Sequence, residues 1–189
     1  MNKENNIILG IIFMTLAMFC LSVNDVLVKG LSTAYPIWEV IFFRAFSGVI
    51  VSIILLFFFG LQTLKTTKPI GHLTRAFSSV ACVVFYFFGL KYLMLSENVA
   101  IVHSAPILAT LLAVPFLGEK LGLHRMAAVA LGFLGVLVIV KPGSDLFKLE
   151  SLFPLAAAFF MAISYLATRF LMSTESSVSI IFNYSLALF

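Results

Sequence analysis

Polar and ionisable side chains inside apolar runs are the residues of this sequence most able to do chemistry. Arg44 lies deep in a run long enough to cross a bilayer, and Asn24 and Asp25 lie near the end of the preceding run. An Arg or Asp at the centre of a membrane helix costs about 2.5–3.5 kcal/mol, so such groups usually face a protein interior or a wet cavity. Two interpretations of Arg44 stay open: a structural ion pair between helices, or an anchor for an anionic group of a substrate.

The neighbours of these residues are also charged. Asp25 and Lys29 are four residues apart, where helical side chains meet. This spacing predicts an ion pair within one helix or, together with the adjacent Asn24, the polar lining of a cavity. Glu39 lies about 140° around the helix from Arg44, so each of the two is expected to find its partner on another helix.

Two further candidates lie in later apolar runs. His103 can titrate near neutral pH or serve only in packing and hydrogen bonding. Pro106 follows it, and proline removes a backbone hydrogen bond and can kink a helix. Kinked membrane helices expose carbonyl groups that need partners, and transporters use them around binding sites. Tyr86 either reaches the same cavity or packs among its aromatic neighbours.

The composition defines the class of protein. Hydrophobic residues make up 62% and charged residues 11% of the chain, and the mean hydropathy is +1.14. Soluble domains have roughly 45–50% apolar and about 25% charged residues. The apolar runs last about 20 residues without alternating, which indicates helices and argues against a β-barrel. The sequence therefore predicts an all-α polytopic membrane protein that contacts the lipid bilayer, and the scattered basic residues give no nucleic-acid surface.

A hydropathy window of about 19 residues divides the chain into spans. The last of them supplies fewer residues than the roughly 20 needed to cross, so we expect the sequence to be a fragment of a longer protein. Lys and Arg are more frequent in the loops on the side of the N-terminus, which predicts a cytoplasmic N-terminus. The expected spans are 7–30, 36–61, 73–93, 97–117, 124–141 and 151–172, with a truncated seventh starting near 177.

An internal repeat relates the two ends of the chain. A shift of 140 residues places Lys29 on Arg169 without a gap, so the first span matches the sixth and the second matches the truncated seventh. A repeat of five spans would enter the membrane from the opposite side, as in inverted-repeat carriers. We therefore expect a first domain at 7–142, the start of a second at 151–189, and ten helices in the complete protein.

Small residues in the fifth span predict close packing of helices. Gly132 and Gly135 lie on roughly one face with Ala128. Such faces let helix backbones approach one another, either within the fold or in a homodimer. We assign Lys29, Pro106, Gly132 and Gly135 structural roles.

No pattern in the chain indicates an enzyme. The sequence lacks the metalloprotease His-Glu-x-x-His, the Gly-x-Ser-x-Gly nucleophile elbow, the P-loop and the dinucleotide-binding Gly-x-Gly-x-x-Gly. Cys20 and Cys82 are distant from each other and have no ligand spacing. We predict no catalytic residue, no cofactor and no metal site.

Several segments resemble a known family. The run from Leu90 to Leu121, including Pro106 and Phe116-Leu-Gly-Glu119, followed by Leu131-Gly-Phe-Leu-Gly135, resembles the second half of an EamA domain of the drug/metabolite transporter superfamily. This resemblance implies ten helices in two inverted five-helix repeats, a bacterial inner-membrane location and a central cavity. Asn24-Asp25-Val-x-x-Lys29 with Glu39-Val-x-Phe-Phe-Arg44 is similar to carriers described as S-adenosylmethionine uptake transporters.

The leading prediction is a secondary transporter of small polar metabolites that works by alternating access. A drug/metabolite exporter of the same fold and a non-transporting membrane assembly protein are the alternatives. We consider a passive channel less attractive because no span presents a continuous polar stripe. The residues predicted to line the substrate pathway are Asn24, Asp25, Glu39, Arg44, Tyr86 and His103.

Overall fold

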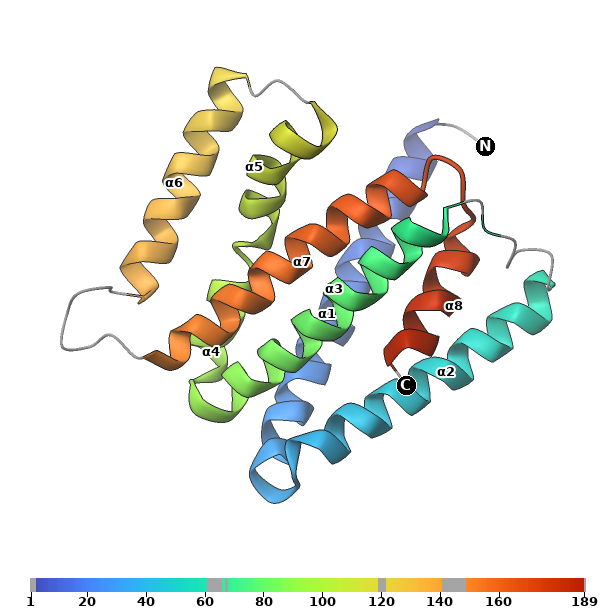
Figure 1. Ribbon diagram of the computed structural model, residues 1–189, viewed down its shortest axis with the longest axis horizontal. Coiled ribbons are helices and arrows are strands. Elements are labelled where there is room, and N and C mark those ends of the chain that lie inside the picture. Colours follow the sequence, from blue (N-terminus) through green and yellow to red (C-terminus); the bar gives the residue numbers. More distant parts are fainter. Residues whose placement is uncertain (1–2, 61–65, 67, 119–121, 141–148, 189) are drawn as a thin grey trace.

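A computed structural model describes residues 3–60, 66, 68–118, 122–140 and 149–188. All regular structure in these residues is helical, as Figure 1 shows. Six helical segments are long and apolar enough to cross a bilayer, which confirms the predicted all-α polytopic membrane fold. The elements are α1 (Lys3–Ala34), α2 (Ile37–Phe59), α3 (Pro69–Tyr92), α4 (Leu95–Val102), α5 (Ala105–Leu117), α6 (Leu123–Val140), the 3-10 helix η2 (Leu149–Ser151), α7 (Leu152–Leu171) and α8 (Ser177–Leu188).

Proline and glycine define several helix ends. Pro36 directly precedes α2, and Pro69 occupies the first turn of α3, where its missing N–H needs no partner. Gly118 ends α5 in the left-handed conformation, with φ of 65°, which residues with a Cβ rarely adopt. These residues therefore fix where α2 and α3 begin and where α5 ends.

The fourth predicted span consists of two helices instead of one kinked helix. α4 and α5 are separated at His103 and Ser104. Pro106 has no N–H to donate to the carbonyl of Val102, and the Ile107 N–H donates to the Ser104 carbonyl at 2.9 Å. Residues Leu95–Phe116 together still have the length and hydropathy of one membrane span. The break lies at the place that the sequence indicated, and both linking residues keep right-handed helical dihedral angles.

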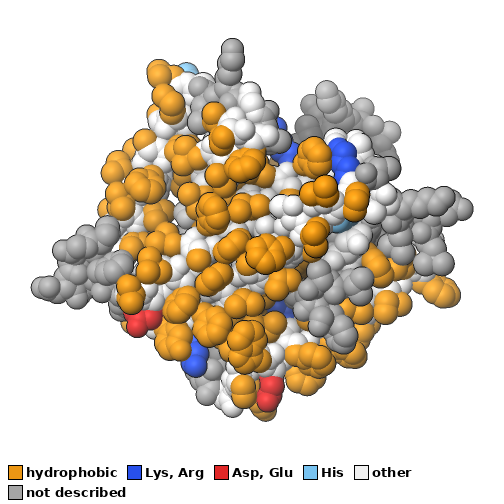
Figure 2. Space-filling view, in the orientation of Figure 1, with side chains coloured by type: hydrophobic (Ala, Val, Ile, Leu, Met, Phe, Trp, Pro, Cys, Tyr) orange, Lys and Arg blue, Asp and Glu red, His pale blue; other side chains and the backbone are white. Residues whose placement is uncertain are grey.

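Large apolar side chains cover the outer surface. Phe57 and Phe58 at the end of α2 are 92% and 80% exposed. Figure 2 shows hydrophobic side chains over most of the visible face, with few charges among them. Apolar patches of this size are rare on soluble monomers and require lipid or further helices to cover them. The surface therefore agrees with a multi-pass membrane protein.

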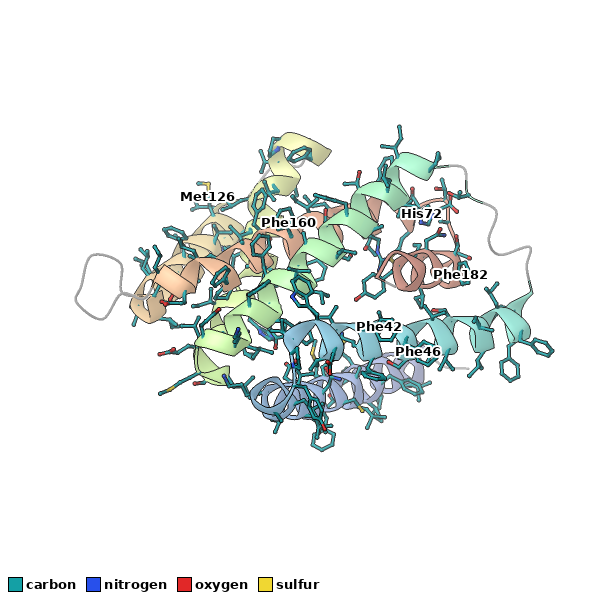
Figure 3. All side chains as sticks on the ribbon, turned by 60° about the horizontal axis from the view of Figure 1, so that its bottom comes forward. Phe42, Phe46, His72, Met126, Phe160 and Phe182 are labelled. Atoms are coloured by element: carbon teal, nitrogen blue, oxygen red, sulfur yellow. The ribbon has the colours of Figure 1, made fainter. Side chains whose placement is uncertain are left out.

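α3 and α7 form the centre of the molecule and lie side by side (Figure 1). A Cβ on Gly71 of α3 would lie 2.9 Å from Leu171 Cδ2 of α7, so the two helices approach closely where α3 begins. The ring of Phe160 on α7 lies 6.2 Å from the Phe77 ring and 5.7 Å from the Phe85 ring, centroid to centroid (Figure 3). α2 and α8 pack together beside α3, and α5 packs against α7.

Candidate functional site

Arg44 of α2 turns towards α1 inside the helix bundle. Its Nη1 donates a hydrogen bond to Asn24 Oδ1 at 2.6 Å. The guanidinium carbon lies 5.9 Å from the centre of the Phe87 ring on α3. Within the described residues, no carboxylate lies within the 4.0 Å of an ion pair with Arg44. In this part of the structure the cation is therefore held by an amide and an aromatic face, and no described acid forms an ion pair with it.

Asp25 and Tyr86 form the second pair at this place. The Asp25 carboxylate and the Tyr86 phenol lie close enough to interact, which links α1 to α3. Tyr86 packs against the buried cluster that includes Val28, Val40 and Phe87. We call Asn24, Asp25, Arg44 and Tyr86 the Arg44 cluster. Three helices contribute to it, and it offers a cation, a carboxylate, an amide and a phenol within membrane-spanning segments.

Lys29 contacts a different part of α3 from the part that its neighbour Asp25 contacts. Its Nζ donates to the carbonyls of Leu90 and Leu93, the latter at 2.9 Å. These carbonyls lie at the C-terminal end of α3, where no further helical turn supplies an N–H donor. Lys29 thus caps α3, whereas Asp25 contacts Tyr86.

Glu39 and His103 lie apart from the Arg44 cluster. Glu39 is exposed in the first turn of α2. His103 is exposed where α4 ends, and its Nδ1 lies 2.8 Å from the Val99 carbonyl. In the described part of the chain neither side chain contacts the cluster. The structure therefore brings together four of the six predicted pathway residues.

The residues predicted to be structural take different positions. Pro106 lies in the first turn of α5. A Cβ on Gly132 would come within 2.3 Å of Ile107 Cδ1, so α6 approaches α5 closely at this glycine. No heavy atom from outside the local helix lies within 4 Å of a Cβ placed on Gly135. The homodimer expected through this face stays a prediction.

α3 carries a stripe that the sequence interpretation missed. His72, Arg75, Ser79, Cys82 and Tyr86 follow one another at spacings of three or four residues. At 3.6 residues per turn they fall within an arc of about 80°. The statement that no span has a continuous polar stripe was therefore wrong. The signal in the sequence is the spacing of three or four residues, which places all five side chains on one face of a helix.

This α3 stripe contacts different helices along its length. The Ser79 and Ser164 hydroxyls are 2.8 Å apart, which joins α3 to the middle of α7. Arg75 donates from Nε to Thr168 Oγ1 at 2.7 Å and from Nη1 to the Ile180 carbonyl at 2.9 Å. The stripe thus connects the Arg44 cluster to polar groups on α7 and α8.

The amino-acid sequence of the chain is similar to those of known membrane transporters. The model of the EamA-like transporter family matches residues 8–141. The chain is 33% identical to an S-adenosylmethionine uptake transporter of Rickettsia felis over 92% of its own length and 59% of that protein. It is 34% identical to a riboflavin transporter of Vibrio cholerae over 61% of its length and 39% of that protein. It is 29% identical to the pseudopaline exporter CntI of Pseudomonas aeruginosa over 93% of its length and 62% of that protein.

The similarity to these relatives covers only part of their length. The chain spans about 59% of the length of the S-adenosylmethionine uptake transporter. No solved structure matches the chain. The family model covers most of the chain, which confirms the resemblance that its motifs indicated. The protein therefore belongs to the EamA-like transporter family of the drug/metabolite transporter superfamily.

Proposed function

We propose that the chain forms the first part of a secondary transporter that moves small polar metabolites across the bacterial inner membrane. Relatives named for S-adenosylmethionine uptake, riboflavin transport and pseudopaline export support a transport function. Because the chain covers only part of these relatives, the activity is proposed for the complete transporter. Its first domain would be 7–142, with a second starting at 151.

The Arg44 cluster is the observation that carries this proposal. Arg44 contacts Asn24 rather than an acid, and Asp25 contacts Tyr86. A carboxylate of a substrate can form charge-assisted hydrogen bonds with the guanidinium. An amine or sulfonium group can approach the Asp25 carboxylate. The substrate class is therefore a zwitterion or a cation with a carboxylate, such as an amino acid or S-adenosylmethionine.

Alternating access would expose this cluster to each side in turn. The 140-residue shift relates α1 to α7 and α2 to α8, which supports two units of opposite orientation. The higher frequency of Lys and Arg in the loops on the side of the N-terminus supports a cytoplasmic N-terminus. The break between α4 and α5 supplies a point where the backbone can bend within one span. The direction of transport can be import, as in the named uptake relative, or export, as in the named exporter.

Uptake in cells that express the complete transporter tests the assignment. Arg44→Ala should abolish uptake of labelled amino acids or S-adenosylmethionine, because the anchor for the carboxylate is lost, while the protein is still found folded in the membrane. Arg125→Ala, which removes an exposed arginine at the start of α6, is the control and should transport normally. Full transport by the Arg44→Ala variant would disprove the role of the cluster.

A further inference from the structure

A groove opens between α3, α5 and α7 at the end of the bundle where α3 begins. Its volume is about 600 Å³, and α7 contributes Ile163, Leu166 and Ala167 to its lining. The side chains of Ile70 and Phe116, which also line it, are 78% and 74% exposed. The groove therefore opens on the outer surface of the helix bundle, where a membrane protein meets the lipid.

The lining of the groove has few polar groups. Thr74 donates its hydroxyl to the Ile70 carbonyl at 2.9 Å, within its own helix, so this hydroxyl already has an acceptor. Lys68, the residue directly before α3, is the only charged residue among the described residues that line the groove. The groove thus fits a hydrocarbon chain along its length and an anionic group at Lys68.

Neutral groups hold the Lys68 ammonium. Its Nζ lies 4.0 Å from the centre of the Phe170 ring and donates to Ser173 Oγ at 3.3 Å. No carboxylate of the described residues lies within the 4.0 Å of an ion pair with Lys68. Glu175, in the same turn as Ser173, faces His72, with 3.9 Å between Oε2 and Nε2. The positive charge of Lys68 can therefore attract an anion at the mouth of the groove.

The place of Lys68 relative to the membrane is that of a lipid headgroup. It directly precedes the apolar span Pro69–Tyr92, so its charge is expected at the boundary between hydrocarbon and water. Basic residues at this level attract anionic headgroups, and basic pockets between transmembrane helices bind them. With a cytoplasmic N-terminus, this end of α3 faces the cytoplasm.

We propose that this groove binds one anionic phospholipid, with the phosphate of its headgroup at Lys68 and one acyl chain between α3, α5 and α7. A zwitterionic phospholipid carries a second cation next to its phosphate, which weakens the attraction to Lys68. The bound lipid would hold the start of α3 against the ends of α5 and α7, which lie around the groove (Figure 1).

The repeat favours lipid over further helices of the complete transporter as the occupant. The shift of 140 residues relates α7 to α1. α3 and α5 pack on α7, so their counterparts in the second unit are expected to pack on α1. Most side chains of α1 are exposed in this chain, which leaves its surface for those counterparts. This step rests on the repeat of the proposed function.

Lipid titration of the purified chain in detergent tests the site. Phosphatidylglycerol, which is anionic, and phosphatidylcholine with the same acyl chains are added, and native mass spectrometry measures their binding. The wild type should bind phosphatidylglycerol more tightly. Lys68→Gln should weaken this binding about fivefold and leave phosphatidylcholine binding unchanged. Lys91→Gln is the control, because Lys91 also lies over a ring, 5.2 Å from the centre of the Tyr92 ring at the other end of α3, and should keep the wild-type preference.

A second variant tests the binding of the acyl chain. Thr74→Trp should fill the groove and weaken the binding of both lipids. Thr15→Trp is the matched control, because Thr15 is also exposed and donates its hydroxyl to the carbonyl four residues earlier, in α1. It should bind both lipids as the wild type does. Equal binding of the two lipids by the wild type, or equal affinity of the wild type and Lys68→Gln for phosphatidylglycerol, would overturn the proposal.

The same titration of the complete transporter shows what occupies the groove there. Lys68→Gln should again lose the preference for phosphatidylglycerol. A preference found only in the shorter chain would mean that further helices or a second copy fill the groove, which would also overturn the proposal. Lipid binding is measured without transport, so a failure of lipid binding and a failure of the proposed transport are separate results.

Discussion

At the scale of single residues, the main feature is an arginine inside the membrane with a neutral hydrogen-bond partner. Asn24 accepts from Arg44 and adds no charge, so the cation can still attract an anion. Hydrogen bonds to charged groups contribute about 1.5–3 kcal/mol, which is enough to hold the guanidinium in place. Asn24 therefore fixes the position of the Arg44 guanidinium without neutralising its positive charge.

Asn24→Asp should leave the stability of the protein unchanged and weaken the binding of the substrate. The new carboxylate would pair with Arg44 and keep the link between α1 and α2, so the Tm should not fall. The same carboxylate would occupy the guanidinium and repel an anionic substrate group. We expect uptake to fall at least about tenfold, which corresponds to about 1.4 kcal/mol of lost binding. The measurements are thermal unfolding and labelled uptake.

Ser96→Asp is the control for this substitution. It adds the same charge at an exposed position in the first turn of α4, away from the Arg44 cluster. Uptake by this variant should match the wild type. If Asn24→Asp also transports normally, the anionic group of the substrate does not bind at Arg44.

At the scale of helices, a side chain of α1 holds the C-terminal end of α3 in place. Lys29 of α1 caps its C-terminal carbonyls. Lys29→Met keeps the apolar stem but removes the donor, so the carbonyls of Leu90 and Leu93 lose a charged partner. We expect a loss of about 1–3 kcal/mol in the free energy of unfolding. Lys91→Met, at an exposed position in the last turn of α3, should change stability much less.

Gly89 is a second determinant of α3 packing. A Cβ at this position would lie 1.9 Å from Asn98 Oδ1 and 3.2 Å from Pro154 Cδ. Asn98 is fully buried, so it has little space to move away. Gly89→Ala should therefore destabilise the protein by about 1–3 kcal/mol, measured by thermal unfolding in detergent.

Gly10→Ala provides the matched control. Gly10 lies in α1, and no heavy atom from outside its own helix lies within 4 Å of a Cβ added there. Alanine has the higher helix propensity by about 1 kcal/mol, so this variant should be as stable as the wild type or slightly more stable. Equal losses in both variants would mean that the contact with Asn98 does not determine the packing of α3.

At the scale of the whole molecule, the sequence predicted the spans well, because a bilayer requires long apolar runs bounded by polar turns. Asn24, Asp25 and Arg44 were recognisable because polar groups inside such runs are unfavourable. The direction in which each of these groups points depends on the packing of other helices. The sequence alone therefore could not show that Glu39 lies outside the Arg44 cluster. His72 of α3 and Glu175, in the turn after α7, are distant in the chain, and their side chains come within 3.9 Å of each other only because α3 packs against α7.

The orientation of the molecule can be predicted and tested as a whole. Ser173, in the α7–α8 turn, lies beside Lys68 at the start of α3, whereas Ser96 lies in the first turn of α4. Three candidate spans separate Ser96 from Ser173, so they should face opposite sides of the membrane. With Cys20 and Cys82 replaced by alanine, Ser173→Cys should react with an impermeant maleimide only from the cytoplasmic side and Ser96→Cys only from the periplasmic side. Labelling of both from one side would contradict this arrangement, and the reverse pattern would overturn the cytoplasmic N-terminus.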